Sequence, residues 1–177
     1  NKRSISLNLD SKFGQQVVRD LAKEADVLVD DHSTSFMEDR NIHPGHLREI
    51  NPSLVVTSMP EFDQRSKYSS YRMTELNLYA MSGLMSRVGA FGKPPLKAGG
   101  YQSHFMAGLY AGALTTFGIY KAQREKQGAW LQTSSIESCT KIFAHCVDYM
   151  SEEPANVEPG MHRDRSNSVM KCKDGYV

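Results

Sequence analysis

The sequence predicts an α/β protein with a parallel sheet and helices between its strands. Short apolar runs at residues 25–29 and 54–58 are typical of strands that are covered on both faces. The segments that connect them carry the spacing of amphipathic helices and end at breakers such as Asn51 and Pro52. This alternation over the first 60 residues is the βαβ pattern of a doubly wound sheet.

The first expected element is a strand at residues 5–9, where apolar and polar residues alternate. Asp10 or Ser11 can then cap a helix by accepting hydrogen bonds from its first amide groups. Apolar residues predict one buried face of this helix, with Phe13, Val17 and Leu21 four apart and Val18 and Ala22 beside them. The next elements are a strand, a short helix and a strand, at residues 25–30, 46–50 and 54–58.

The rest of the chain is expected to be mainly helical. A loop with four glycines and two prolines, at residues 89–100, separates two of the helices. The expected helices cover residues 76–85, 102–124 and 136–150, and a strand-like segment covers residues 130–136. Within the long helix the uncharged apolar part is sixteen residues, whereas a membrane span needs about 20. We therefore expect a buried core helix and no association with a membrane.

Composition excludes some classes of function. The 177 residues suffice for a domain with a real core, and a formal net charge of +1 gives no basic field for nucleic acid. Three cysteines are an odd number without close pairing, which predicts a reducing compartment such as the cytoplasm, the mitochondrion or the peroxisome. Since the chain lacks an initiator Met, we expect it to be a segment of a longer protein.

Three consecutive segments resemble the family III CoA-transferases, the family of the formyl-CoA and carnitine CoA-transferases. These segments are AMSGLM at residues 80–85, GKPPLKAG at 92–99 and GGYQSHFMAGLYA at 99–111. The resemblance implies a Rossmann-like large domain that includes residues 1–150, a linker at 151–170, and the start of a smaller domain at 171–177. It also implies interlocked dimers, a CoA thioester and a small carboxylate as substrates, and no metal.

The residue four before the helix glycine Gly108 is an aspartate in that family, and it takes first the acyl group and then CoA. In this chain it is His104, and no Asp or Glu occurs from residue 76 to residue 124. An imidazole can be acylated, but it cannot become the aspartyl-CoA thioester. We expect this segment to lack the nucleophile, and His104 remains the catalytic candidate as a base or as a ligand for a carboxylate.

The same resemblance supplies the candidate CoA-binding residues. Arg72 falls where a family lysine or arginine approaches CoA, and three further candidates are Asp31, His32 and Arg40. Asp39 falls where an arginine usually helps to hold the nucleotide end of CoA, and a carboxylate there repels phosphate.

Several functions fit this pattern. The chain can be the non-catalytic half of a tandem enzyme, as in the fused proteins that attach CoA to dimethylsulfoniopropionate and cleave it. It can also be a structural or regulatory pseudoenzyme that dimerises with an active relative, or an enzyme that uses His104 in altered chemistry. An α-methylacyl-CoA racemase is the fourth reading, but the catalytic histidine and aspartate of that class fall at Thr74 and His104.

Overall fold

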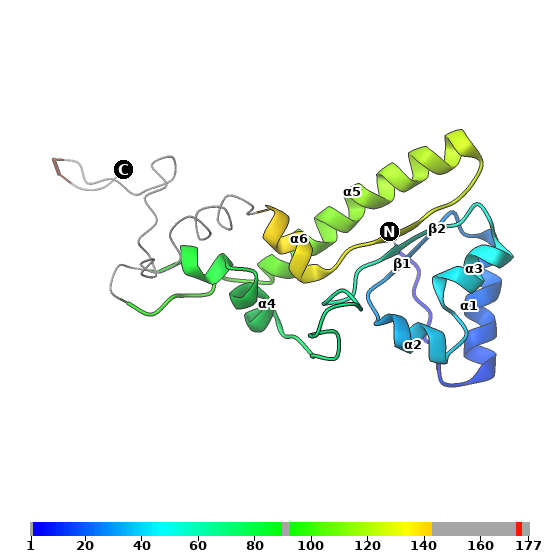
Figure 1. Ribbon diagram of the computed structural model, residues 1–177, viewed down its shortest axis with the longest axis horizontal. Coiled ribbons are helices and arrows are strands. Elements are labelled where there is room, and N and C mark those ends of the chain that lie inside the picture. The colour runs from blue at the N-terminus through cyan, green and yellow to red at the C-terminus, as the bar shows by residue number, and fades with distance from the viewer. Residues whose placement is uncertain (1, 90–92, 143–172, 175–177) are drawn as a thin grey trace.

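A three-stranded parallel sheet forms the centre of the chain. The structure is a computed structural model that describes residues 2–89, 93–142 and 173–174 (Figure 1). Its strands are β1 (Val27–Asp30), β2 (Val55–Ser58) and β3 (Trp130–Gln132), in the order β1-β2-β3. Both pairs of neighbouring strands are parallel. The predicted α/β class is confirmed, and the two apolar runs near residues 25–30 and 54–58 form neighbouring strands.

The strand expected at residues 5–9 is wrong. These residues have no regular secondary structure, and Ile5 is 65% exposed. Their backbone is used at the start of the next helix instead, because the Ser11 amide donates to the Asn8 carbonyl and the Gln15 side chain donates to the Leu9 carbonyl. The segment packs beside a helix end and does not extend the sheet.

Helix α1 (Lys12–Glu24) has the expected cap but a partly different buried face. The Ser11 side chain accepts a hydrogen bond from the Gly14 amide. Ala22 is buried as predicted, but Phe13 is 77% exposed and Leu21 is 56% exposed, so the predicted face is wrong at these two residues. The buried residues are Gly14 and Ala22, each one position further along the helix, which is a rotation of about 100°. A side chain at Gly14 would place its Cβ 2.1 Å from the Asn8 carbonyl oxygen.

Helices cover both faces of the sheet (Figure 1). Ala22 of α1 and Leu47 of α3 (Pro44–Ile50) pack with Leu54 and Val56 into one core cluster. The long helix α5 (Gln102–Glu125) lies on the other face, where the Thr115 hydroxyl is 2.7 Å from the Thr57 hydroxyl. The short helix α2 (Thr34–Asp39) follows the end of β1.

A second core cluster lies where three helices meet beyond the sheet. They are α4 (Glu75–Met81), the start of α5, and α6 (Ser135–Ile142), with the 3-10 turn η1 (Leu84–Arg87) between α4 and α5. The buried residues of the cluster are Leu78, Tyr79, Leu84 and Cys139. The helices expected at 76–85, 102–124 and 136–150 correspond to α4 with η1, to α5 and to α6. The part of the last prediction beyond residue 142, the expected linker 151–170, and all of 171–177 except 173–174 lie outside the described residues.

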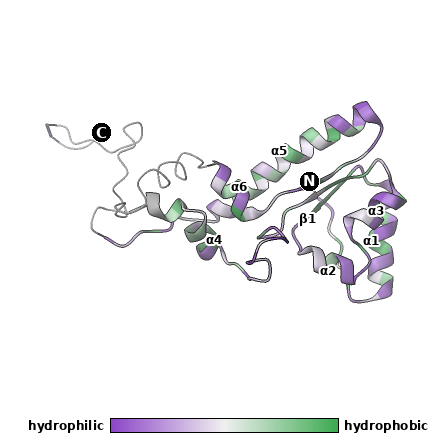
Figure 2. Ribbon diagram, viewed as in Figure 1, coloured by the Kyte–Doolittle hydropathy of each residue, from purple (hydrophilic) through white to green (hydrophobic). Residues whose placement is uncertain are grey.

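Helix α5 is buried on one side only. Its buried residues are Ser103, Ala107, Ala111 and Gly118, whereas Phe105, Leu109 and Phe117 are 67%, 74% and 72% exposed. The expected core helix is therefore buried along one side and exposed along the other. Figure 2 shows apolar and polar residues mixed along α5 and a polar C-terminal end. Within the described parts of the chain, no helix combines the length and apolar character that crossing a membrane requires.

We predict that Gly118→Ala destabilises the protein. An added Cβ would lie 2.6 Å from Leu131 Cδ1 and 2.8 Å from Val55 Cγ1, so either these side chains or α5 itself would have to shift. Overpacking of this kind costs about 1–3 kcal/mol. Gly112→Ala is the matched control on the same helix, because its added Cβ meets nothing within 4 Å. Chemical denaturation of both variants measures the difference, and equal midpoints would contradict this packing.

Candidate functional site

A cavity of about 490 Å³ opens at the carboxyl ends of the first two strands. Its lining comes from residues that directly follow β1, from the segment that follows β2, and from the loop before α4. These lining residues include Asp31, Thr34, Pro60, Glu61, Phe62, Tyr71 and Arg72. In open parallel sheets, ligands bind in the crevice outside the carboxyl ends of the strands. The position and the volume both suit a small-molecule site.

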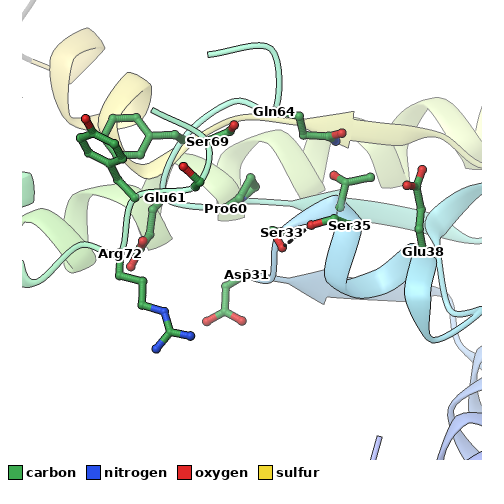
Figure 3. Close-up of a pocket in the computed structure, with 13 residues that line it drawn as sticks. Asp31, Ser33, Ser35, Glu38, Pro60, Glu61, Gln64, Ser69 and Arg72 are labelled. Carbon is green, nitrogen blue, oxygen red and sulfur yellow. Dashed lines mark hydrogen bonds between the residues drawn. The ribbon is translucent and has the colours of Figure 1, made fainter. Parts of the chain in front are cut away.

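The cavity carries more negative than positive charge. Asp31, Glu38 and Glu61 contribute carboxylates, and Arg72 is the one cation among the described residues that line it. Figure 3 shows the Arg72 guanidinium and the Asp31 carboxylate extending to the same open side of the cavity. Glu61 is partly engaged, since its Oε2 accepts a hydrogen bond of 2.9 Å from the Met73 amide. A multiply charged anion therefore meets one favourable and three unfavourable charges here.

A smaller cavity of about 120 Å³ adjoins the first one and shares Asp31 and Glu61 with it. Thr74, His104 and Ser135 line this cavity, and they lie at the starts of helices α4, α5 and α6, respectively. The apolar residues Met59, Met73, Leu78 and Ala107 complete the lining. The sheet edge and the three helix starts thus surround one small chamber beside the larger crevice.

Glu75 connects α4 to the start of α5. It is only 8% exposed, and its Oε1 accepts a hydrogen bond of 3.1 Å from the Ser103 amide. Its Oε2 lies 3.4 Å from the His104 amide nitrogen and 2.5 Å from His104 Nδ1. The N-cap residue of α5, Tyr101, provides no side-chain bond, so the carboxylate from another helix satisfies these free amide groups.

The surroundings of Glu75 favour its ionised form. Burial by itself raises the pKa of this carboxyl, but hydrogen bonds from the His104 ring and from the backbone of Ser103 and His104 outweigh it. The pKa of Glu75 therefore lies below its ordinary value. The Lys97 ammonium lies 3.8 Å from Oε1 and adds a positive charge near the carboxylate.

Of the residues predicted from the sequence, Asp31 and Arg72 line the larger cavity, and His104 lines the smaller one. His32 and Arg40 line neither. The His32 ring lies 2.8 Å from Asp30 Oδ1 and stacks on Phe36 with ring centroids 4.3 Å apart.

The Arg40 guanidinium lies 3.7 Å above the Phe36 ring and forms an ion pair with Asp10. On helix α2, the Glu38 side chain lines the larger cavity, whereas the exposed Asp39 does not. The carboxylate that faces this cavity from α2 is therefore one residue earlier than the sequence indicated.

Glu75 is the site residue that the sequence analysis did not select. Its role depends on contacts with residues 28 and 29 positions later in the chain, which no local pattern reveals. The only sequence signal was the position of Glu75 as the first residue of α4. Its burial, which the structure shows, means that the carboxylate needs a partner.

One group of possible metal ligands occurs among the described residues. Donor atoms of Asp30, Asp31 and His32 lie within 4.8 Å of one another. Two of the three residues are exposed, and exposed acidic groups of this kind are common without a metal. The geometry alone does not make a metal centre.

The fold and the crevice agree with a comparison to known families. The family model described as CoA-transferase family III matches residues 1–177. The chain belongs to CoA-transferase family III.

Two relatives and two solved structures illustrate the relationship. The chain is 25% identical over 177 residues to succinyl-CoA:(R)-benzylsuccinate CoA-transferase subunit BbsE of Thauera aromatica, which covers 99% of this chain and 43% of the relative. It is 32% identical over 163 residues to formyl-CoA:oxalate CoA-transferase of Escherichia coli, which covers 87% of this chain and 39% of the relative.

A crystal structure of a CAIB/BAIF family protein from Brucella suis matches with a TM-score of 0.81 and 21% identity, over 99% of this chain and 47% of that chain. A hypothetical protein from Mycobacterium tuberculosis matches with a TM-score of 0.81 and 18% identity over the same shares. These structures support the fold. This family III chain spans less than half the length of the relatives named here.

We predict that Glu75→Gln lowers the free energy of unfolding by about 1–3 kcal/mol at neutral pH, because charge-assisted hydrogen bonds at the start of α5 become neutral ones. Since the folded pKa of Glu75 is lowered, its contribution is complete above the ordinary carboxyl value of 4.5 and is lost as the pH falls through the folded pKa. Denaturant titrations across this range measure it. Glu49→Gln, at an exposed residue, is the control, and a pH-independent difference would contradict the role of Glu75.

Proposed function

We propose that this chain is part of a family III CoA-transferase that exchanges CoA between an acyl-CoA and a carboxylate, and that this segment does not supply the nucleophile. The observation that carries the proposal is the start of α5, where an imidazole faces the small cavity. Family chemistry needs a carboxylate that forms a mixed anhydride and then a thioester. His104 can form neither of these.

Glu75 is a poor substitute for the missing aspartate. It is buried, and both of its oxygens accept hydrogen bonds at the start of α5. Attack on a thioester would break these bonds and remove the charge that they stabilise. The nearest carboxylate to His104 is therefore better suited to positioning than to acyl transfer.

The proposed substrates are a CoA thioester and a small carboxylate. Arg72 and Asp31 are the proposed CoA-binding residues that line the larger cavity. Arg72 can bind a phosphate, whereas Glu38 and Glu61 oppose the charge of the nucleotide end. To bind CoA, His32 would have to give up its contact with Asp30, and Arg40 would have to give up its contacts with Phe36 and Asp10. We expect CoA to bind this segment weakly.

The nucleophile then belongs to a second, Asp-bearing copy of the pattern in the other half of a tandem protein, or to a different subunit. One observation supports such a partner: one similar protein is named as a subunit. A structural or regulatory pseudoenzyme is the alternative, and it differs by binding no acyl-CoA. The racemase reading is less favourable, because Thr74 lines the same cavity as His104 but its hydroxyl donates to Asn77 and is no acid–base partner.

We predict that no covalent acyl or CoA adduct forms on an Asp or Glu of residues 1–177. The full-length protein is incubated with acyl-CoA and any adduct is mapped by mass spectrometry of its peptides. An adduct on a carboxylate outside these residues, or on a partner subunit, is the expected result. A thioester on Glu75, Asp31 or any other carboxylate of this segment would show that it supplies the nucleophile.

We also predict that Glu38→Gln strengthens CoA binding roughly two- to fivefold, the usual effect of removing one exposed repulsive charge. Asp39→Asn is the matched control, because Asp39 is the next residue on α2 but does not line the cavity. Calorimetric titration of CoA into the full-length variants measures both. Equal affinities for the two variants would place CoA elsewhere.

A further inference from the structure

His104 is held as one half of a carboxylate–imidazole pair. Its Nδ1 lies 2.5 Å from Glu75 Oε2, and the carboxylate is only 8% exposed, whereas the His104 side chain is 55% exposed. A hydrogen on Nδ1 that donates to a buried carboxylate leaves Nε2 as the ring nitrogen that can accept a proton. This arrangement orients an imidazole and stabilises the imidazolium that forms when it acts as a base.

The cavity beside the imidazole has room for water and a short acyl group. Its volume of about 120 Å³ is a few times the share of one water in the liquid, about 30 Å³. Met59, Leu78 and Ala107 form apolar walls, and the Ser135 side chain adds a hydroxyl. Because this chamber adjoins the larger crevice, a thioester lying there can place its acyl end beside His104.

The charges around the imidazole favour one role over another. Asp31 after β1 and Glu61 after β2 line the chamber, and the Glu75 carboxylate of α4 lies 2.5 Å from the His104 ring, which also lines it. The Lys97 ammonium offsets part of the negative charge at Glu75. These negative charges would repel a carboxylate group of a substrate that entered the chamber. Water and an uncharged acyl group are accepted more easily. His104 is therefore better placed as a base than as a ligand for a carboxylate.

We propose that His104 and Glu75 hydrolyse acyl thioesters that carry a short uncharged acyl group, an activity that rests on the proposed binding of acyl-CoA. Nε2 of His104 takes a proton from water as the water oxygen bonds to the thioester carbonyl carbon. The carbon–sulfur bond then breaks, and the departing thiolate takes the proton from the imidazolium. The products are a carboxylic acid, which ionises, and the free thiol. No carboxylate nucleophile, oxidant or second substrate is needed.

The test measures thiol release by the full-length protein with acetyl-CoA, succinyl-CoA and the acetyl thioester of N-acetylcysteamine. Both acetyl thioesters should be hydrolysed, and succinyl-CoA more slowly because its tail is anionic. His104→Ala should lower kcat about 100-fold or more, the contribution of a general base, and added imidazole should restore part of the rate. His46→Ala changes an exposed histidine outside both cavities and should leave hydrolysis unchanged.

Glu75 is tested as a positioning residue. Glu75→Gln keeps an oxygen for the amide groups of α5, and it should lower kcat at least about tenfold with little change in KM. A parallel loss of kcat and of folded protein by circular dichroism would indicate a structural role only. In that case His104→Gln decides between the two roles. It changes a half-exposed side chain, removes the base and keeps the Glu75 carboxylate at the start of α5, so a loss of kcat in this variant supports the base.

The outcomes separate this inference from the proposed function. Saturable binding of acetyl-CoA without thiol release above the buffer rate overturns the hydrolysis and leaves the transferase proposal standing. Release of N-acetylcysteamine without any binding of acyl-CoA supports the dyad and overturns the proposed CoA site. Equal rates for the unmodified protein and His104→Ala, or an acyl group found on His104, overturn the role of a general base.

Discussion

The buried carboxylate of Glu75 organises the end of the molecule where the candidate chemistry lies. It accepts hydrogen bonds from two amide groups at the start of α5 and from the ring of His104. Because the N-cap residue of this helix provides no side-chain hydrogen bond, the contact with Glu75 satisfies amide groups at its start. The same charge orients the imidazole, so the stability of the helix start and the geometry of the site depend on one side chain.

The third helix of this cluster is connected through a thiol. Cys139 of α6 donates a hydrogen bond to the Ser103 carbonyl, one residue before His104. Burial, and then the charge of Glu75, raise the pKa of Cys139 to about 11, so the thiol keeps its proton at neutral pH and remains a donor. Helices α4, α5 and α6 are thus joined by polar contacts between buried groups. Polar contacts between buried groups restrict the helices to one packing arrangement, because their hydrogen bonds require specific partners and directions. Apolar contacts alone are less specific.

The parallel sheet determines which side chains can meet this cluster. Because β1 and β2 run in the same direction, the residues that follow them arrive at one edge, and Asp31 and Glu61 line both cavities. This is the place where the fold supports ligand binding in general. The side chains decide what is bound, and here they include three carboxylates, the guanidinium of Arg72 and the imidazole of His104. A shared fold therefore leaves room for chemistry that differs from the family reaction.

The sequence by itself determined the class of fold and most of its elements. Apolar runs predicted two neighbouring parallel strands, Ser11 was among the two candidates for the cap of α1, and the long uncharged segment predicted α5. These features depend on local spacing and on backbone hydrogen bonding, which a sequence carries directly. The segments that resemble the CoA-transferases also indicated the family and drew attention to His104.

Only the tertiary structure decided which surfaces pack and which side chains pair. The face of α1 that is buried depends on the Asn8 backbone lying against Gly14, not on the more apolar row with Phe13 and Leu21. The pairing of Glu75 with His104 joins residues 29 positions apart on two helices, and its strength comes from burial of the carboxylate. Burial and contacts between distant elements arise from the whole fold, so neither composition nor periodicity could specify them.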